Sequence, residues 1–128
     1  MKAKDIMNDK FLVFDAEVPL KTCLKNFKNG GFCVVLKNGI INKVLCEDDI
    51  LKYIVKGKDI LLGSIKSNSK FCIVDPETDV EKVIELLKDF DIIIVKDGNY
   101  FGIITKKEIS EINQLIFDEI EEKSEIVY

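Results

Sequence analysis

The side chains of this chain that could do chemistry are four cysteines, adjacent pairs of acids and 19 lysines. The cysteines are Cys23, Cys33, Cys46 and Cys72. No two of them form a Cys-x-x-Cys pair, which predicts buried, reduced thiols. The acid pairs Asp48-Asp49 and Glu121-Glu122 have no catalytic partner at helical spacing, and the chain lacks histidine, arginine and tryptophan. Histidine bases, histidine-ligated metals and guanidinium forks are therefore excluded, which argues against an enzyme and leaves a lysine or carboxylate base as the remaining catalytic route.

Composition and charge favour a small globular protein. Of 128 residues, 47% are apolar and 33% charged, and no apolar run approaches the roughly 20 residues of a membrane span. Since no signal segment is evident, we expect a cytoplasmic protein with no membrane contact. The charge is uneven, because residues 108–128 carry one lysine and seven acids, whereas residues 1–107 are nearly neutral. No basic stripe is present, so we expect no direct contact with nucleic acid.

An internal repeat with a period of about 60 residues organises the chain. The segment 11–17 (FLVFDAE) matches 71–77 (FCIVDPE), and Val13 and Ile73 should occupy equivalent strand positions. Each segment is followed by the same apolar stripe, which predicts an amphipathic helix packed against the strands. The stripe residues are Leu20, Cys23, Leu24 and Phe27 in the first repeat, and Val80, Val83, Ile84 and Leu87 in the second.

The rest of each repeat predicts a hairpin and a closing helix. Continuous apolar strands over 32–36 and 92–95 are typical of strands covered on both faces. The dipeptides Asn38-Gly39 and Asp97-Gly98 supply the positive φ angles of tight turns into strands 40–45 and 100–104. The closing helices cover about 46–56 and 105–122, and the residues expected to face inward are Ile50, Tyr53, Ile54, Ile109, Ile112, Ile116 and Ile120.

The predicted fold class is α+β, with two β-α-β-β-α motifs packed about a pseudo-twofold axis. We place the first motif at 1–59, the second at 60–116 and an acidic helical tail at 117–128. A short helical lead-in precedes each motif, at 5–7 and 64–66. The few polar residues at 57–59 are too short a linker to separate two independent domains.

Three landmarks in this order resemble the cystathionine β-synthase (CBS) domain family, present here as a tandem pair over about 2–116. They are Lys4-Asp5-Ile6-Met7, the turn Asp75-Pro76-Glu77-Thr78, and Gly102-Ile-Ile-Thr105-Lys-Lys-Glu108-Ile109. The resemblance implies a Bateman module, with up to two clefts for adenosine-containing ligands such as AMP, ATP or S-adenosylmethionine. Such modules regulate an attached domain or partner and dimerise. Similar pairs occur in transcription activators, nucleotide-metabolism enzymes and transporters.

The family's ligand signature is present, with one change, in the second repeat. Gly102 and Thr105 match it, and the hydroxyl of Thr105 and the first N–H groups of the helix would face a phosphate. Lys106 and Lys107 add positive charge there. Glu108 stands where the family has the aspartate that accepts hydrogen bonds from ribose. The alternative is a simple helix cap with a solvated first turn.

The first repeat departs further from the signature. Lys43 replaces glycine and Cys46 replaces threonine, whereas Asp49 is retained at the ribose position. Glu47 and Asp48 stabilise the helix start and repel phosphate, so an uncharged adenosine-like group suits this cleft better. The resemblance also implies adenine walls at the strand starts, with core packing as the alternative. The wall candidates are Phe11, Leu12, Phe71 and Cys72, and Ile65 in the lead-in is a further candidate.

The helix faces left outside each motif predict a homodimer, through Leu51, Tyr53 and Ile54 together with Ile112, Leu115 and Ile116. The acidic end and the apolar finish at 126–128 indicate a linker to a further C-terminal domain, with a stand-alone protein as the alternative. We therefore expect a non-catalytic module that senses an adenine nucleotide as a regulatory ligand, without a cofactor or metal. A structural dimerisation module with degenerate clefts is the alternative function.

Overall fold

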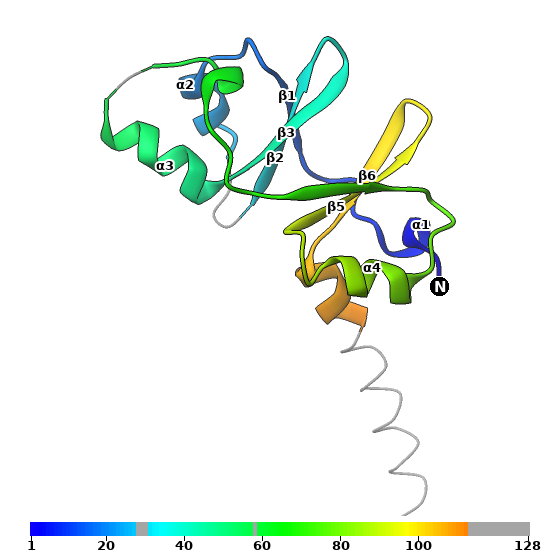
Figure 1. Ribbon diagram of the computed structural model, residues 1–128. Helices are drawn as coiled ribbons and strands as arrows, with labels where there is room; N and C mark the ends of the chain where they lie inside the picture. The colour runs from blue at the N-terminus through cyan, green and yellow to red at the C-terminus, as the bar shows by residue number, and fades with distance from the viewer. Residues whose placement is uncertain (28–30, 58, 113–128) are drawn as a thin grey trace, which may run out of the picture. The chain divides into compact units, whose positions relative to one another are not determined.

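Helices and short strands alternate along this chain in the order that the repeat predicts (Figure 1). The computed structural model describes residues 1–27, 31–57 and 59–112. The elements of the first half are α1 (Ala3–Ile6), β1 (Leu12–Asp15), α2 (Leu20–Leu24), β2 (Phe32–Lys37), β3 (Ile40–Cys46) and α3 (Glu47–Val55). Those of the second half are η1 (Leu62–Ser64), β4 (Phe71–Val74), α4 (Val80–Leu86), β5 (Ile92–Asp97) and β6 (Tyr100–Ile104), and residues 106–112 are helical. The mixed fold with two motifs is confirmed.

The chain divides into two compact units whose limits differ from those of the sequence repeats. One unit is Lys10–Phe71, and the other joins Met1–Asp9 to the chain from Cys72 onward. The N-terminal lead-in therefore folds with the second repeat, beside the β5–β6 hairpin (Figure 1). Asn8 and Ile103 exchange two backbone hydrogen bonds of 2.8 and 2.9 Å there. Correspondingly, the segment that leads into the second repeat folds with the first.

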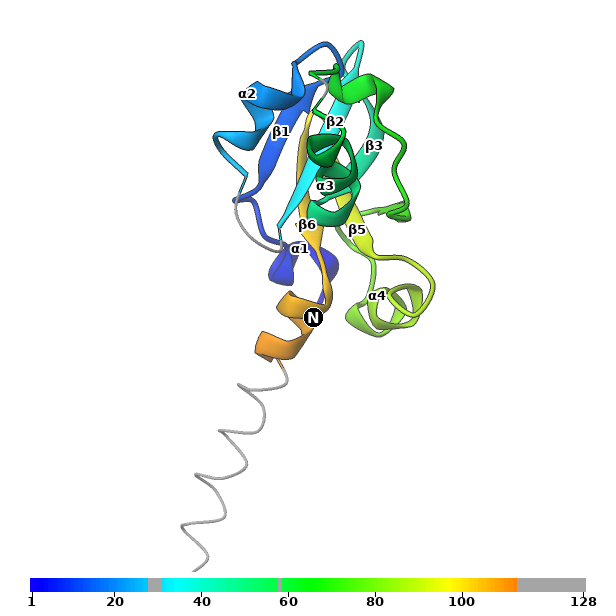
Figure 2. The same ribbon diagram turned by 90° about the vertical axis from the view of Figure 1, so that its left-hand side faces the viewer.

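The unit 10–71 is built on a three-stranded sheet in the order β1-β2-β3 (Figure 2). β1 is parallel to β2, with Leu12 opposite Cys33, and β2 is antiparallel to β3, with Phe32 opposite Cys46. Both helices contribute to its core, because apolar side chains of α2 and α3 pack with those of the strands. The buried core is Ala16, Leu20, Cys23, Cys33, Val35, Leu45, Ile50, Leu62 and Ile65.

The other unit repeats this plan with the order β4-β5-β6. β5 and β6 are antiparallel, with Ile93 opposite Ile104. Its buried core is Ala3, Val83, Leu87, Ile93, Val95 and Ile104. Val13 and Ile73 lie in the first strands of the two sheets, with similar exposed fractions of 41% and 47%. The equivalence of these positions stays a prediction, which superposition of the two halves tests.

Two helix residues that we expected to be buried are exposed. Ile84 on α4 is 41% exposed and Ile54 on α3 is 40% exposed. Val83 and Leu87, one turn apart, carry the inward face of α4, whereas Ile50 and partly buried Tyr53 carry that of α3. These helices are covered on one side only, so a residue at the edge of the stripe stays accessible to solvent.

The two hairpin turns are not equivalent. Asn38 and Gly39 both have positive φ, at 53° and 75°, as a type I′ turn requires. In the second hairpin Asp97 ends β5, and the turn residues are Gly98, with a φ of 60°, and Asn99. The prediction that Asp97-Gly98 forms this turn is thus wrong by one residue. A single glycine at the first turn position fits type II′ instead.

The four thiols are free, but only two are fully buried. Cys23 and Cys33 are wholly buried, and their mutual hydrogen bond together with burial raises the pKa of Cys33. Cys46, at the end of β3, and Cys72, in β4, are only partly buried, which corrects the prediction of four buried thiols. Among the described residues, no helix is long and apolar enough to cross a membrane. The predicted positions of Leu115, Ile116, Ile120 and the acidic tail lie outside those residues.

Candidate functional site

The start of the last helix brings together the residues of the second-repeat signature. The backbone N–H of Thr105 donates to Glu108 Oε1 at 3.2 Å, and its hydroxyl lies 3.2 and 3.1 Å from Oε1 and Oε2 of the same carboxylate. The Thr105 hydroxyl also accepts a 3.3 Å hydrogen bond from the N–H of Lys107. Glu108 is buried, whereas Lys106 and Lys107 are exposed. The sequence-predicted cap is therefore present, with two ammonium groups beside it.

Gly102 has a packing role at this site. A Cβ built on it would lie 2.7 Å from Sδ and 2.8 Å from Cγ of Met7. The side chain of Met7 thus occupies the space that a larger residue at position 102 would fill. The glycine of the signature lets the N-terminal lead-in pack against β6, where Asn8 and Ile103 are bonded.

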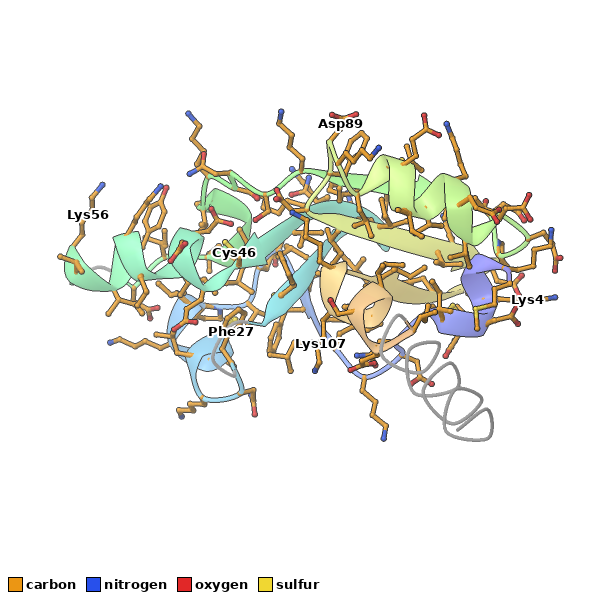
Figure 3. All side chains as sticks on the ribbon, turned by 90° about the horizontal axis from the view of Figure 1, so that it is seen from below. Lys4, Phe27, Cys46, Lys56, Asp89 and Lys107 are labelled. Carbon is orange, nitrogen blue, oxygen red and sulfur yellow. The ribbon has the colours of Figure 1, made fainter. Side chains whose placement is uncertain are left out.

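The start of α3, beside Cys46 in Figure 3, is the corresponding site of the first motif. It carries the same kind of cap around a shorter carboxylate. Asp49 Oδ2 accepts a 3.0 Å hydrogen bond from the Cys46 N–H and a 3.3 Å hydrogen bond from the Cys46 thiol. Asp49 also binds the lead-in of the second repeat: Oδ1 accepts from the N–H of Asn68 at 2.9 Å, and Oδ2 accepts from the hydroxyl of Ser69 at 3.2 Å. Only 1% of Asp49 is exposed, so all of these bonds are internal.

Lys43, in place of the signature glycine, holds the same lead-in. Its ammonium donates to the carbonyl oxygens of Gly63 and Ile65, each at 2.8 Å. Further along, the N–H of Lys66 donates to the hydroxyl of Tyr53 at 3.2 Å. Side chains of β3 and α3 thus fasten residues 63–69 over the first motif.

The hydrogen bonds and burial of Asp49 and Lys43 shift the pKa values of both residues. Burial alone raises the pKa of Asp49, but the hydrogen bonds from Cys46, Asn68 and Ser69 together lower it by more, so the net pKa is lowered. Burial lowers the pKa of Lys43. An ionised Asp49 is therefore favoured by the donors that surround it.

The structure sorts the predicted site residues into two sets. Gly102, Thr105, Lys106, Lys107, Glu108 and Cys72 fall in one compact unit. Cys72 and Ile109 pack against the same core there, so this strand start is part of the motif that holds the helix start. The other unit holds Phe11, Leu12, Cys46, Asp49, Ile65 and Phe71. Ile65 is fully buried in its core, whereas the strand-start residues Phe11, Leu12, Phe71 and Cys72 are partly buried.

The lead-in residues that bind Asp49 and Lys43 were not predicted from the sequence. Lys43 was predicted only as a departure from the family pattern. The polar run Ser67-Asn68-Ser69, which begins two residues after buried Ile65, was the available signal, because hydroxyl and amide donors in a linker need acceptors when they are partly buried. The sequence carries no comparable signal for the packing of Met7 on Gly102.

The repeated strand-helix-hairpin-helix plan, with a capped helix after each hairpin, defines a pair of CBS-type motifs. A family model for the CBS domain matches residues 3–56 and 62–113. The chain belongs to the CBS domain family and carries a domain pair, which is generally a regulatory, non-catalytic module. A search of curated proteins finds no match.

Solved structures with the same fold are similar over most of this chain. A hemolysin-like protein containing a CBS domain, from Oenococcus oeni, is 20% identical with a TM-score of 0.73, covering 87% of this chain and 88% of that one. The CBS domain pair of protein MJ0100, solved with 5′-methylthioadenosine and S-adenosyl-L-methionine, is 17% identical with a TM-score of 0.67, covering 89% and 96%. The cytosolic domain of the Mg2+ channel MgtE, solved with ATP, is 18% identical with a TM-score of 0.67, covering 87% and 48%.

Proposed function

We propose that this chain is a non-catalytic regulatory module that binds an adenosine-containing ligand in its second motif. The ligand class is AMP, ATP or S-adenosylmethionine, acting as a regulatory ligand rather than as a cofactor. Binding is transmitted to an attached C-terminal domain or to a partner protein, with a transcription regulator as one candidate output. Membership of the CBS family supports this class of function, as do the nucleoside ligands of the MJ0100 and MgtE structures.

The observation that carries this proposal is the arrangement of Thr105, Glu108 and two exposed lysines at one helix start. Both donors to the Glu108 carboxylate belong to Thr105, within the part of the chain that the structure describes. A ribose can replace these donors with its hydroxyls without displacing another segment of the chain. Lys106 and Lys107 supply positive charge for a phosphate at the positive end of the helix. Cys72, in the same compact unit, is the proposed adenine wall, and Gly102 keeps the lead-in in place.

The helix start of the first motif is less suited to a nucleotide. Glu47 and Asp48 place negative charge where a phosphate would lie. Cys46 offers a thiol in place of a hydroxyl, and it already donates to Asp49. A site lined by Phe11 and Leu12 would therefore take an uncharged adenosine-like group at most.

A ligand panel tests the proposal. Thermal shift and calorimetry with AMP, ADP, ATP, NAD and S-adenosylmethionine should give at least one binder, which at 100 times its dissociation constant stabilises the fold by about 2.7 kcal/mol. Thr105→Val should abolish that shift. Thr22→Val is the matched control, because Thr22 is exposed on α2. If no compound stabilises the chain, or if both variants bind alike, the second-motif site is wrong.

The alternative function, a structural dimerisation module, is favoured by one surface. On α3 the side chains of Leu51 and Val55 are 44% and 86% exposed, and Ile54 continues this apolar face. A second copy of the chain that covers this face would bury it in a homodimer in the cytoplasm. Both clefts would then be degenerate.

Light scattering decides the assembly. We expect a dimer at tens of micromolar, which Leu51→Glu with Val55→Glu should dissociate if α3 forms the interface. The double variant Leu115→Glu, Ile116→Glu tests the other predicted part of the interface in the same way. A monomeric wild type, or a dimer that resists both pairs of charges, would contradict this interface. A dimer that binds none of the panel ligands would favour the alternative function.

A further inference from the structure

The hydrogen bonds around Asp49 have a pattern that bears on which motif can take a ligand. An ionised carboxylate only accepts hydrogen bonds, at roughly four lone-pair positions. Asp49 has four donors: the N–H and thiol of Cys46, the N–H of Asn68 and the hydroxyl of Ser69. Only 1% of the residue is exposed, so the acceptor position that is left on Oδ1 is not accessible to solvent or to a ligand.

Two of these four donors come from the lead-in, and their geometry imitates a ribose. A ribose offers two neighbouring hydroxyls, each of which can donate to one oxygen of a carboxylate. Asn68 donates to Oδ1 at 2.9 Å and Ser69 donates to Oδ2 at 3.2 Å, so consecutive residues occupy both oxygens. The carboxylate that would recognise a ribose in the first motif is already paired with donors from the chain itself.

The lead-in is anchored directly before this contact, at residues 62–67. Leu62 and Ile65 are fully buried in the core, and Lys43 binds the carbonyl oxygens of Gly63 and Ile65. The hydroxyl of Ser67 donates to the carbonyl oxygen of Val44 on β3. A ligand would have to break several bonds of this anchored segment at once to reach Asp49. Among the residues that the structure describes, the donors to Glu108 belong to Thr105.

We propose that residues 66–69 act as an internal ligand of the first motif: Asn68 and Ser69 occupy Asp49 and exclude a ribose. The chain then takes one adenosine-containing ligand, in the second motif alone. The identity of that ligand rests on the proposed function, whereas the occupation of Asp49 by the lead-in does not. The first motif then has a structural role, and the second motif alone senses the ligand.

Hydrogen exchange at the Asn68 amide tests the occupation directly, because Asn68 is an exposed residue whose N–H is bonded to buried Asp49. By NMR, this amide of the full chain should exchange at least about tenfold more slowly than an unstructured one. Asp49→Ala should remove that protection. Asp48→Ala, an exposed acid in the same turn, should leave it unchanged within about twofold. If Asp49→Ala does not fold, Ser69→Ala should speed the exchange severalfold. An Asn68 amide that is unprotected in the wild type overturns the proposal.

The ligand experiment then separates the two proposals. A saturating panel ligand should leave the exchange of the Asn68 amide unchanged and should bind with one site per chain in calorimetry. Two sites per chain, or exchange at Asn68 that rises severalfold with ligand, would mean that ribose displaces the lead-in, and the internal ligand is wrong. If nothing in the panel binds, the proposed function fails, whereas protection at Asn68 that depends on Asp49 still supports the internal occupant.

Discussion

The starts of α3 and of the last helix differ in what their buried carboxylates bind. Asp49 has the shorter side chain, caps Cys46 and accepts hydrogen bonds from Asn68 and Ser69. Glu108, with one methylene more, folds back on Thr105, and both of its donors belong to that residue within the described chain. In the first motif, the carboxylate at this position of the repeat joins the start of α3 to the lead-in. In the second motif, the equivalent carboxylate bonds only to the start of its own helix, among the described residues.

Lys43 and Gly102, six positions before the two carboxylates, also bind a lead-in in one motif and make room for one in the other. Lys43 bonds two carbonyl oxygens of residues 63–65, whereas Gly102 makes room for Met7. The first motif therefore holds the lead-in of the second repeat with polar bonds. The second motif holds the N-terminal lead-in with an apolar contact and the paired backbone groups of Asn8 and Ile103. Duplicated motifs can divide their roles in this way, since side chains at equivalent positions serve structure in one copy and stay available for a ligand in the other.

The largest expected effect is on the free energy of unfolding, which should fall much more when Asp49 is replaced than when Glu108 is replaced. Asp49→Ala leaves the N–H groups of Cys46 and Asn68 and the hydroxyl of Ser69 without the carboxylate that accepts from them, and should lower the free energy of unfolding by about 4 kcal/mol. Glu108→Ala removes a helix cap only and should cost about 1 kcal/mol. Urea unfolding of both variants, with Asp48→Ala as a control within about 0.5 kcal/mol, measures the contrast. Equal costs would mean that the lead-in bonds of Asp49 contribute nothing.

The pH dependence sharpens the same contrast. The hydrogen bonds to Asp49 hold its pKa in the folded chain below its ordinary value of 3.8, so the folded state binds fewer protons than the unfolded state. This contribution to stability is fully present above about pH 4 and is lost as the pH falls through the lowered pKa. The difference in unfolding free energy between wild type and Asp49→Asn should therefore be constant from pH 7 to 5 and shrink below 3.8. A constant difference down to pH 2.5 would contradict it.

A third effect compares how the lead-ins are packed. Gly102→Ala forces Met7 to move, because the new Cβ would lie 2.7 Å from its sulfur, and should cost about 2 kcal/mol. Met7→Ala leaves a void and should cost a similar amount, about 2 kcal/mol. The double variant should cost about 1 kcal/mol less than the sum of the two, since the alanine at position 102 partly fills that void. Chemical unfolding of all three variants gives the coupling.

Combining Met7→Ala with Gly63→Ala provides the control. The close neighbours of Gly63 are Cβ and the backbone oxygen of Ala16, at 2.9 and 3.1 Å, so Met7 has no part in its packing. These two substitutions should be additive. The contact between Met7 and Gly102 would be contradicted if Met7→Ala and Gly102→Ala were additive. It would also be contradicted if Met7→Ala and Gly63→Ala were coupled.

The elements of this fold were predictable because their signals are local or repeated. Apolar periods and turn dipeptides set the strands and helices, and the repeat of 11–17 at 71–77 checked one copy against the other. The limits of the compact units were not predictable in this way. Met7 and Gly102 are far apart in sequence, so the exchange of lead-ins depends on tertiary packing that no periodicity records.

The site was predictable only in part, for a related reason. The family pattern located Thr105 and Asp49 correctly at helix starts, but it assigns a residue type to a position and not the partners that this chain supplies. The bonds from Asn68 and Ser69 to Asp49 join residues nearly 20 positions apart. Similarly, the φ angle of Asn38 could be read from an Asn-Gly pair, whereas the one-residue shift of the second turn depends on where the β5–β6 ladder ends.

The smallest expected effect separates the two hairpin turns. Asn38 has a φ of 53°, a left-handed conformation that asparagine tolerates, whereas Asn99 at the second position of the other turn has a negative φ. Asn38→Ala should therefore cost about 1 kcal/mol, because alanine pays a steric penalty in that conformation. Asn99→Ala should change the unfolding free energy by less than about 0.5 kcal/mol. Asn38→Gly, which restores the freedom to adopt positive φ, should recover most of the loss. If alanine at position 38 is tolerated as well as at position 99, the turns share one geometry, and the difference between type I′ and type II′ is wrong.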